Sequence, residues 1–402
     1  MSLQYPLKGL VVLDLTQIYN GPYATFLMAR AGATVIKIEP PGGEHLRKRV
    51  SEDRQAVTVP FAMINANKQS MCLDLKSKKG REVFLGLVAK ADVVVENFTP
   101  SAMDRLSLGA AALREINPRL VYASSSGYGS SGPYRDFPAM DLAVQAMAGV
   151  IGITGFPDGP PVKAGPAICD FMAGVHLYGA ITTALLHRER TGQGSVVEVS
   201  MMEAIYPTLA SNLGTHSAGD RSTKRTGNRH GGMGLAPYNV YPTSDGYVAI
   251  ITSNEKHWDA VILALDLKDL ADQQIFVSRE KRSKHMDVLD AAITAKTMEH
   301  TQESLVNRLR AASVPCAPVQ ELDDVINDPH LRARGSLKDI EHPIYGNIVV
   351  PESPLRFADM PNPEYRPSVE LGHDTKEILM EMLGLHPDEA VTLTAELQSE
   401  RA

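Results

Sequence analysis

Residues 9–38 read GLVVLDLTQIYNGPYATFLMARAGATVIKI, and the fold follows from this stretch. The nearly continuous apolar run over 9–15 predicts a buried strand, the proline at position 22 predicts a helix over 22–31, and the run over 33–38 predicts a second strand. The alternation continues further along the chain, where we predict a helix over 79–90 and strands over 92–95 and 120–124. Strands that alternate with helices indicate an α/β domain built on a parallel sheet, with helices on both faces.

Polar and glycine-rich residues follow each of these predicted strands. They occupy positions 16–17, 39–43, 96–98 and 125–129. Because ligands of parallel sheets bind beyond the carboxyl ends of the strands, we expect the functional site at this edge. No G-x-G-x-x-G motif follows the first strand, which disfavours a nicotinamide or flavin enzyme of the usual dinucleotide type.

Composition bounds the class of protein. A chain of 402 residues with 44% hydrophobic and 22% charged residues can bury a sizeable core and divide into two or more domains. The net charge of −7 gives no support to a nucleic-acid partner. The apolar runs lack the character of a membrane span and the N-terminus lacks the plan of a signal peptide, so we expect no membrane partner.

Cysteine usage points to a reducing compartment. Cys72, Cys169 and Cys316 are too few and too scattered for a disulfide framework or a zinc site, and neither C-x-x-C nor H-E-x-x-H occurs. We therefore expect a cytoplasmic protein without a bound metal.

The chain changes character after Glu203. A mostly polar stretch ends in the glycine-rich loop 231–234, and beyond it Asp245-Gly246 lies between two strand-like runs, which predicts a hairpin. Helical patterns and one further strand follow, so that residues from about 225 to 325 form a second, small α/β unit.

Asp170 is the most informative single residue. It lies at the mouth of an apolar stretch, 171–186, that carries no formal charge. One interpretation is a helix N-cap, because Asp accepts hydrogen bonds from the first free N–H groups of a helix. The other is a nucleophile that forms a covalent intermediate. Cys169 is the nearest rival nucleophile, but it lacks an evident histidine partner and is more typical of a buried thiol.

Two histidines near these segments have simpler interpretations. His176 lies within the apolar stretch and is expected to be a satisfied core residue, whereas His230 is expected in a loop near substrate.

Several short motifs, taken in their order along the chain, resemble those of a known protein family. They include LKGLVVLD at 7–14, GATVIKIE at 32–39, ADVVVENF at 91–98, TGQG at 191–194 and LGH at 371–373. With these motifs the chain resembles the class III CoA-transferase and racemase family (formyl-CoA and carnitine CoA-transferases, α-methylacyl-CoA racemase) over essentially its whole length.

The resemblance implies a homodimer of two ring-shaped monomers threaded through one another. Each monomer would contain a Rossmann-like large domain and a small α/β domain. The implied division is a large domain over 1–203, a linker over 204–225, a small domain over 226–325, a second linker over 326–351 and a C-terminal part over 352–402 that returns to the large domain.

The resemblance also implies roles at the reacting end of the substrate. Asp170 falls on the nucleophile of the transferase branch, Gln17 on polar contacts near the thioester, and Gly232 and Gly234 on a glycine loop that shields the intermediate from water. The carboxylate would attack an acyl-CoA thioester, and an anhydride and an aspartyl-CoA thioester would follow in turn.

Recognition of coenzyme A requires cations and an adenine pocket. Lys76, Arg105 and the Arg47-Lys48-Arg49 cluster are candidates for phosphate binding, with a solvated surface charge as the alternative for each. By resemblance, Asn97 and Phe98 belong to the adenine-pocket segment.

Two alternatives remain open. The racemase branch needs a His-Asp pair as its base, whereas this chain has Met140-Asp141 at that position, and methionine cannot accept the proton. A CoA-binding protein without catalysis is the alternative from another class. We predict a CoA-transferase that acts on small carboxylic acids, with succinyl-CoA as a candidate donor and Arg229 as a candidate ligand for a dicarboxylate.

Overall fold

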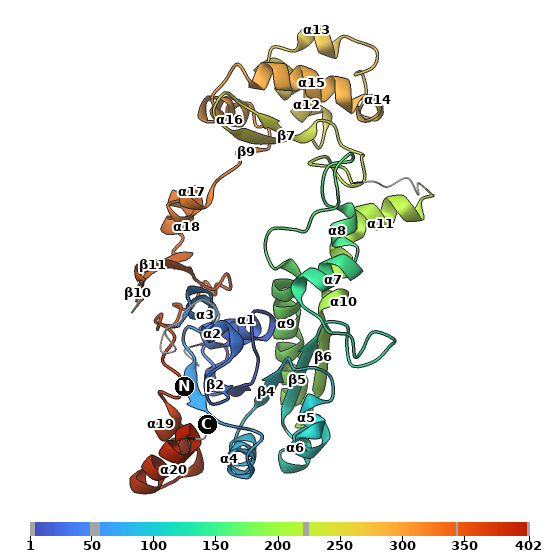
Figure 1. Cartoon of the computed structure of the whole chain (residues 1–402). Helices are drawn as coiled ribbons and strands as arrows, with labels where there is room; N and C mark the ends of the chain where they lie inside the picture. Colours follow the sequence, from blue (N-terminus) through green and yellow to red (C-terminus); the bar gives the residue numbers. More distant parts are fainter. Residues whose placement is uncertain (1–4, 49–56, 220–224, 343–344, 400–402) are drawn as a thin grey trace. The chain divides into compact units, whose positions relative to one another are not determined.

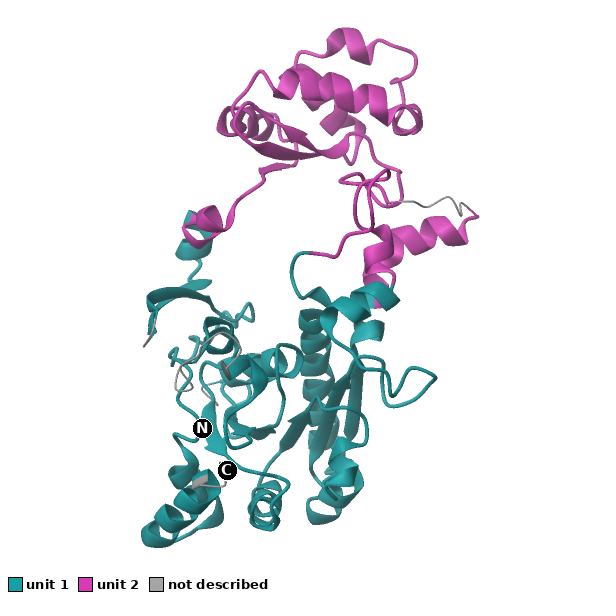
Figure 2. Cartoon of the chain, in the orientation of Figure 1, with its two compact units in different colours: residues 1–148, 165–205, 329–402 teal, residues 149–164, 206–328 magenta. Residues whose placement is uncertain are grey.

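The computed structural model describes residues 5–48, 57–219, 225–342 and 345–399. The chain divides into two compact units (Figure 2). The first contains Met1–Ala148, Gly165–Ile205 and Pro329–Ala402, and the second contains Gly149–Ala164 and Tyr206–Asp328. Residues 149–164, which sequence reasoning placed in the large domain, therefore belong to the second unit.

A six-stranded sheet forms the centre of the first unit. Its order is β3-β2-β1-β4-β5-β6, and every neighbouring pair is parallel. This is the order of a doubly wound nucleotide-binding sheet, in which the strand order reverses between β1 and β4. The strands are β1 (Val11–Asp14), β2 (Thr34–Glu39), β3 (Gln69–Cys72), β4 (Val93–Glu96), β5 (Val121–Ser126) and β6 (Val196–Ser200).

Helices cover both faces of this sheet because its inner strands are apolar on both sides (Figure 1). Leu13 and Val94 pack toward α4 (Lys78–Val88), α6 (Ala110–Ile116), α19 (Thr375–Leu383) and α20 (Pro387–Ser399). Val12 and Val93 pack on the other face, toward α1 (Asn20–Arg30) and α9 (Ile168–Thr191). The parallel α/β fold predicted from the sequence is confirmed.

Helix α9 is long and apolar enough to cross a membrane by length and composition alone. It packs closely on α1, because a Cβ atom at Gly174 would come within 2.6 Å of the Asn20 carbonyl oxygen. Leu177 and Ile181 on the same helix are fully buried against the sheet. These contacts are those of a core helix.

The C-terminal helices close an edge of the sheet. The Asp374 carboxylate accepts a hydrogen bond from the Ser70 N–H at 2.7 Å, and the Thr375 hydroxyl accepts one from the Cys72 N–H at 3.2 Å. The two side chains therefore accept hydrogen bonds from backbone N–H groups that the edge strand β3 would otherwise leave unpaired.

The remaining elements of the first unit are short. They are α2 (His45–Lys48), α3 (Val59–Ile64), α5 (Ala102–Arg105), α7 (Asp141–Met147), α10 (Met201–Ile205), α18 (Pro329–Ala333) and the antiparallel pair β10 (Leu337–His342) and β11 (Gly346–Pro351). The last three lie in the segment that sequence reasoning assigned to a second linker.

The second unit contains an antiparallel sheet in the order β7-β8-β9. Asp245-Gly246 joins β7 to β8, as the hairpin motif predicts. The strands are β7 (Tyr238–Pro242), β8 (Tyr247–Ile251) and β9 (Cys316–Pro318), and the helices are α8 (Val150–Ile153), the 3-10 helix η1 (Tyr206–Leu209), α11 (Ala210–Ser217), α12 (Glu255–Ala264), α13 (Lys268–Ala271), α14 (Arg279–Lys284), α15 (Met286–Thr297), α16 (Gln302–Ala311) and α17 (Leu322–Ile326). Trp258 lies in its core, beneath the guanidinium of Arg282.

Candidate active site

A cavity of about 870 Å³ opens in the first unit beyond the carboxyl ends of the parallel strands. Its walls come from loops that follow β1, β2, β4 and β5, together with Asp170 of α9. Loops on both sides of the β1–β4 reversal contribute, which is where doubly wound sheets bind their ligands. The polar, glycine-rich edge predicted from the sequence is therefore the cavity wall.

Asp170 lies in the first turn of α9 and is not its N-cap. The helix begins at Ile168 with Ala167 as the capping residue, so the N-cap interpretation of Asp170 is wrong. A neighbouring segment supplies the capping contact, because the Asp141 carboxylate accepts the Cys169 N–H at 2.9 Å. The Asp170 carboxylate therefore does not cap the helix.

The electrostatic environment of Asp170 is unusual for a carboxylate. The residue is 9% exposed. Burial, followed by repulsion from Asp141, raises its pKa from 3.8 to about 7. Among the residues that the structure describes, no donor forms a hydrogen bond with its carboxylate. A half-ionised, unshared carboxylate on a cavity wall is a functional-site candidate.

Neither Cys169 nor His176 competes with Asp170. Cys169 is fully buried, and burial, followed by the charges of Asp141 and Asp170, raises the pKa of its thiol to about 12. A thiol that stays protonated is a poor nucleophile. His176 is exposed and its Nδ1 lies 2.8 Å from the Met172 carbonyl, so the core position expected for it is wrong.

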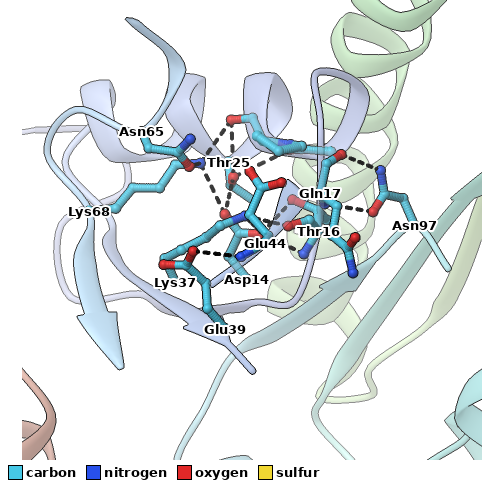
Figure 3. A network of polar contacts seen from close by, with 12 residues as sticks. Asp14, Thr16, Gln17, Thr25, Lys37, Glu39, Glu44, Asn65, Lys68 and Asn97 are labelled. Atoms are coloured by element: carbon cyan, nitrogen blue, oxygen red, sulfur yellow. Dashed lines mark hydrogen bonds and ion pairs between the residues drawn. The ribbon is translucent and has the colours of Figure 1, made fainter. Parts of the chain in front are cut away.

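Gln17 lies on the cavity wall, and Asn97 holds its backbone (Figure 3). The Asn97 side chain accepts the Gln17 N–H at 2.8 Å and donates to the Gln17 carbonyl at 2.8 Å. Ile18, the next residue, has a φ of 65°, which is rare for a β-branched side chain and is found where surrounding contacts enforce it. Asn97 therefore acts on the shape of this loop, although sequence reasoning assigned it to adenine.

Glu44 and His45 also line the cavity, and sequence reasoning missed both. One Glu44 carboxylate oxygen accepts the Leu46 N–H at 2.7 Å, whereas the other is buried and has no partner among the described residues. Burial raises the pKa of Glu44. The glycine pair before Glu44 could have indicated both residues from the sequence, because it marks a loop at the carboxyl end of a strand.

Of the described side chains predicted to bind coenzyme A, which do not include that of Lys48, only Asn97 and Phe98 line the cavity. Lys76 and Arg105 are exposed and lie away from its walls. Arg47 is buried, with two nitrogens on Glu39 at 2.7 and 2.9 Å, so its guanidinium is used inside the protein and the geometry gives it no phosphate-binding role. Arg49 lies outside the described residues.

The glycine loop belongs to the second unit. Gly231 packs closely on Asn212, since a Cβ atom there would lie 2.8 Å from the end of that side chain, which would have to shift. The Gly232 N–H donates to His230 Nδ1 at 3.1 Å, and a Cβ atom at Gly234 would make only an ordinary contact, 3.8 Å from the Gly232 carbonyl oxygen. Arg229 forms ion pairs with Asp287 and Asp290, each at 2.7 Å, so it is already occupied.

Within the described ranges, no group of three or more His, Cys, Asp or Glu side chains is placed to hold a metal ion. The chemistry that these walls offer is that of a reactive carboxylate on the wall of a half-open pocket.

Comparison with known proteins identifies the family. The model of CoA-transferase family III matches residues 7–375. The chain is 36% identical to acetyl-CoA:oxalate CoA-transferase of Acetobacter aceti, over 90% of this chain and 92% of that protein. It is 37% identical to succinyl-CoA:mesaconate CoA-transferase of Haloarcula marismortui, over 92% and 95% respectively.

A solved structure agrees with these sequence relatives. A CAIB/BAIF family protein from Brucella suis superposes with a TM-score of 0.84 at 31% identity, covering 94% of this chain and all of that one. The chain belongs to family III of the CoA-transferases.

Proposed function

We propose that this CoA-transferase moves CoA from an acyl-CoA donor to a small carboxylic acid through a covalent intermediate on Asp170. The observation that carries the proposal is the state of that carboxylate. It lies on the cavity wall with no hydrogen-bond donor among the described residues, and burial followed by the Asp141 charge raises its pKa to about 7. A carboxylate nucleophile reacts in its ionised form, and the burial that raises the pKa also makes that form more basic and less solvated, which increases its reactivity.

The proposed reaction has four exchanges at carbonyl carbon. The Asp170 carboxylate attacks the thioester carbonyl and expels CoA as a thiolate, which leaves a mixed anhydride between Asp170 and the donor acid. The thiolate then attacks the aspartyl carbonyl, which releases the donor acid and leaves an aspartyl-CoA thioester. The acceptor carboxylate attacks that thioester and again expels the thiolate, which finally attacks the new acyl group and restores Asp170.

The position of Asp170 supports this sequence of steps. It sits in the first turn of a 24-residue helix, whose positive end favours the ionised nucleophile and the oxyanions that form beside it. Its 9% exposure limits access of water to an anhydride, which water would otherwise hydrolyse. Coverage of the intermediate by the glycine loop stays a prediction.

Hydroxylamine trapping tests the covalent step. Incubation with an acyl-CoA donor and hydroxylamine should convert Asp170 to a hydroxamate that peptide mass spectrometry locates, and no label should appear without donor. Asp170→Ala should abolish both labelling and transfer. Asp388→Asn, which changes an exposed carboxylate in α20 away from the cavity wall, is the matched control. A variant at position 170 that transfers CoA at the normal rate would favour a CoA-binding role without covalent catalysis.

The racemase alternative has less support. Met140 lies on the cavity wall where a proton-accepting side chain would be needed. Asp141 is engaged, since it accepts the Cys169 N–H at 2.9 Å and the Gln145 amide at 2.6 Å. Loss of α-deuterium from a 2-methylacyl-CoA, without transfer to any acid, would favour racemisation.

The acids remain to be assigned by assay. The relatives' names support small mono- and dicarboxylates, and we propose succinyl-CoA as the first donor to test. A panel of acyl-CoA donors against acid acceptors, read by mass spectrometry, would identify the pair.

We also propose an interlocked homodimer in the cytoplasm. Large apolar side chains remain exposed on α7 and α9 of the single chain, namely Leu142, Met147, Val175 and Leu186, and such surface favours a protein partner. The three free thiols support a reducing compartment. Light scattering after size exclusion would test the dimer.

A further inference from the structure

Coenzyme A carries a diphosphate and a ribose phosphate, and the residues predicted to bind them lie elsewhere. Lys76 and Arg105 are off the cavity wall, and Arg47 is bound to Glu39. Among the described residues that line the cavity, Arg135 is the only lysine or arginine. Because the phosphates of coenzyme A are negatively charged, Arg135 is the candidate residue to bind them in this cavity.

The Arg135 guanidinium has donors to spare. Its Nη2 donates to the Ser101 hydroxyl, which holds the planar group in place. Its Nε is buried and has no acceptor among the described residues. The nearest carboxylate, that of Asp136, is 3.8 Å away and 81% exposed, so it competes weakly. A guanidinium presents five N–H donors, and with Nη2 held by Ser101 the two N–H groups of Nη1 can still bind an oxyanion.

The loop that carries Arg135 is held by aromatic contacts. The Tyr134 and Phe137 rings on either side of it lie 5.2 Å apart, and both pack on Tyr128 at 6.0 and 6.3 Å. Tyr128 and Phe137 line the same cavity. Arg135 is thus presented from a packed cluster at the cavity wall.

A second, smaller cavity shows which side of Arg135 an anion can occupy. This cavity, of about 160 Å³, shares Phe98, Pro100 and Arg135 with the first. Its walls also carry three carboxyl groups, those of Glu96, Asp104 and Glu198. These three groups disfavour a phosphate there. The larger cavity carries two carboxyl groups, those of Glu44 and Asp170, and offers more than five times the volume.

We propose that Arg135 binds a phosphate group of the acyl-CoA substrate through Nη1, while Ser101 holds Nη2. This inference rests on the proposed CoA-transferase function and assigns the ligand end that Asp170 does not touch. It makes Arg135 a binding residue for the nucleotide part of the substrate, which distinguishes it from residues that act on the thioester.

The test compares a full acyl-CoA with the matching acyl-pantetheine thioester, which lacks the nucleotide and its phosphates. Arg135→Gln should raise KM for the acyl-CoA about 10- to 100-fold and leave kcat/KM for the acyl-pantetheine unchanged, since the variant removes only a charge-assisted contact. Arg190→Gln, which changes an exposed arginine in the last turn of α9 and off the cavity wall, should change neither. Arg135→Lys should recover part of the loss.

Two results would overturn the proposal. One is an equal loss by Arg135→Gln with both thioesters, which would indicate a structural role. The other is a loss that appears in Arg190→Gln and not in Arg135→Gln. Calorimetric titration of free CoA into each variant reads the same contact without turnover, so weaker CoA binding by Arg135→Gln would support the assignment even if no acid gained CoA. Dephospho-CoA in the same titration separates the ribose phosphate from the diphosphate.

Discussion

The ammonium group of Lys68 lies 3.0 Å from the carboxylate of Asp14, and both side chains are almost completely buried (Figure 3). Asp14 also accepts the Thr16 N–H at 2.9 Å, one residue before Gln17. Burial alone would raise the pKa of Asp14, but the Lys37 and Lys68 charges outweigh burial and lower it. The loop after β1 therefore rests on a buried charge cluster.

Lys68→Met should strongly destabilise the protein. The variant leaves the Asp14 carboxylate with only Lys37, at 3.9 Å, as a cation, and removal of one partner from a buried pair costs about 3 to 5 kcal/mol. Denaturant unfolding measures the loss. Lys79→Met is the matched control, because Lys79 pairs with Glu396 at the half-exposed surface and should cost less than about 1 kcal/mol. Equal losses in the two variants would show that the cluster has no special role.

Asn97→Ala should lower activity more than stability. It removes two hydrogen bonds from the Gln17 backbone, each worth about 0.5 to 1.5 kcal/mol, and releases the strained conformation of Ile18. We expect kcat/KM to fall about 10- to 100-fold. Steady-state kinetics with one donor and acceptor pair measures the effect.

Asn117→Ala provides the comparison for Asn97. Its amide donates to two carbonyls, of Val88 at 3.0 Å and Ala91 at 2.8 Å, and it lies away from the cavity. This variant should lose a similar amount of stability and keep its specific activity. If both variants lose activity in proportion to stability, Asn97 does not position the loop for catalysis.

The rate should depend on the ionisation of Asp170. Because burial, followed by Asp141, raises its pKa to about 7, kcat/KM should increase with pH up to about 7 and fall roughly tenfold per unit below pH 6. Asp141→Asn removes the repulsion, so the acid limb should shift to lower pH. A pH profile of kcat/KM for both proteins is the measurement. If the acid limb of the pH profile stays unchanged in Asp141→Asn, that limb does not report the ionisation of Asp170.

The same carboxylate should cost stability at neutral and higher pH. Its pKa of about 7 in the folded protein exceeds the ordinary value of 3.8, so its contribution to stability is intact below pH 3.8 and is lost as pH rises through 7. Asp170→Asn should therefore be more stable than the unaltered protein at pH 8, by up to about 4 kcal/mol, and the difference should shrink toward pH 5. Chemical unfolding at the two pH values tests this, and a difference independent of pH would contradict it.

Local patterns were enough for the inner strands of the large sheet and for the position of Asp170 at the start of an apolar helix, whereas its catalytic role stays a prediction. Each inner strand is a short apolar run, and Asp170 is the charge that interrupts an apolar stretch. Strands β3 and β6 gave a weaker signal, because QSMC is polar at its start and VVEVS carries a charge at its centre. Their place in the sheet depends on partners far along the chain.

Contacts between distant residues explain the failures at the site. The capping of α9 comes from Asp141, 28 residues before the N–H group that it accepts. Arg47 was predicted to bind phosphate because a sequence shows a cation without showing Glu39 beside it. Arg135 follows the glycine-rich loop after β5, yet only the structure separates it from the other arginines.

Two possible roles of Arg229, support of the glycine loop and binding of a substrate carboxylate, predict different kinetics. In the second unit its guanidinium pairs with Asp287 and Asp290, and Tyr241 donates to the same Asp290 at 2.6 Å. Arg229→Gln should therefore loosen the base of the glycine loop and lower kcat by a similar factor for mono- and dicarboxylate acceptors. If Arg229 instead bound the distal carboxylate of a substrate, the loss would appear in KM and only with dicarboxylates. Tyr241→Phe, which weakens the same cluster without changing a cation, should reproduce the uniform loss to a smaller extent.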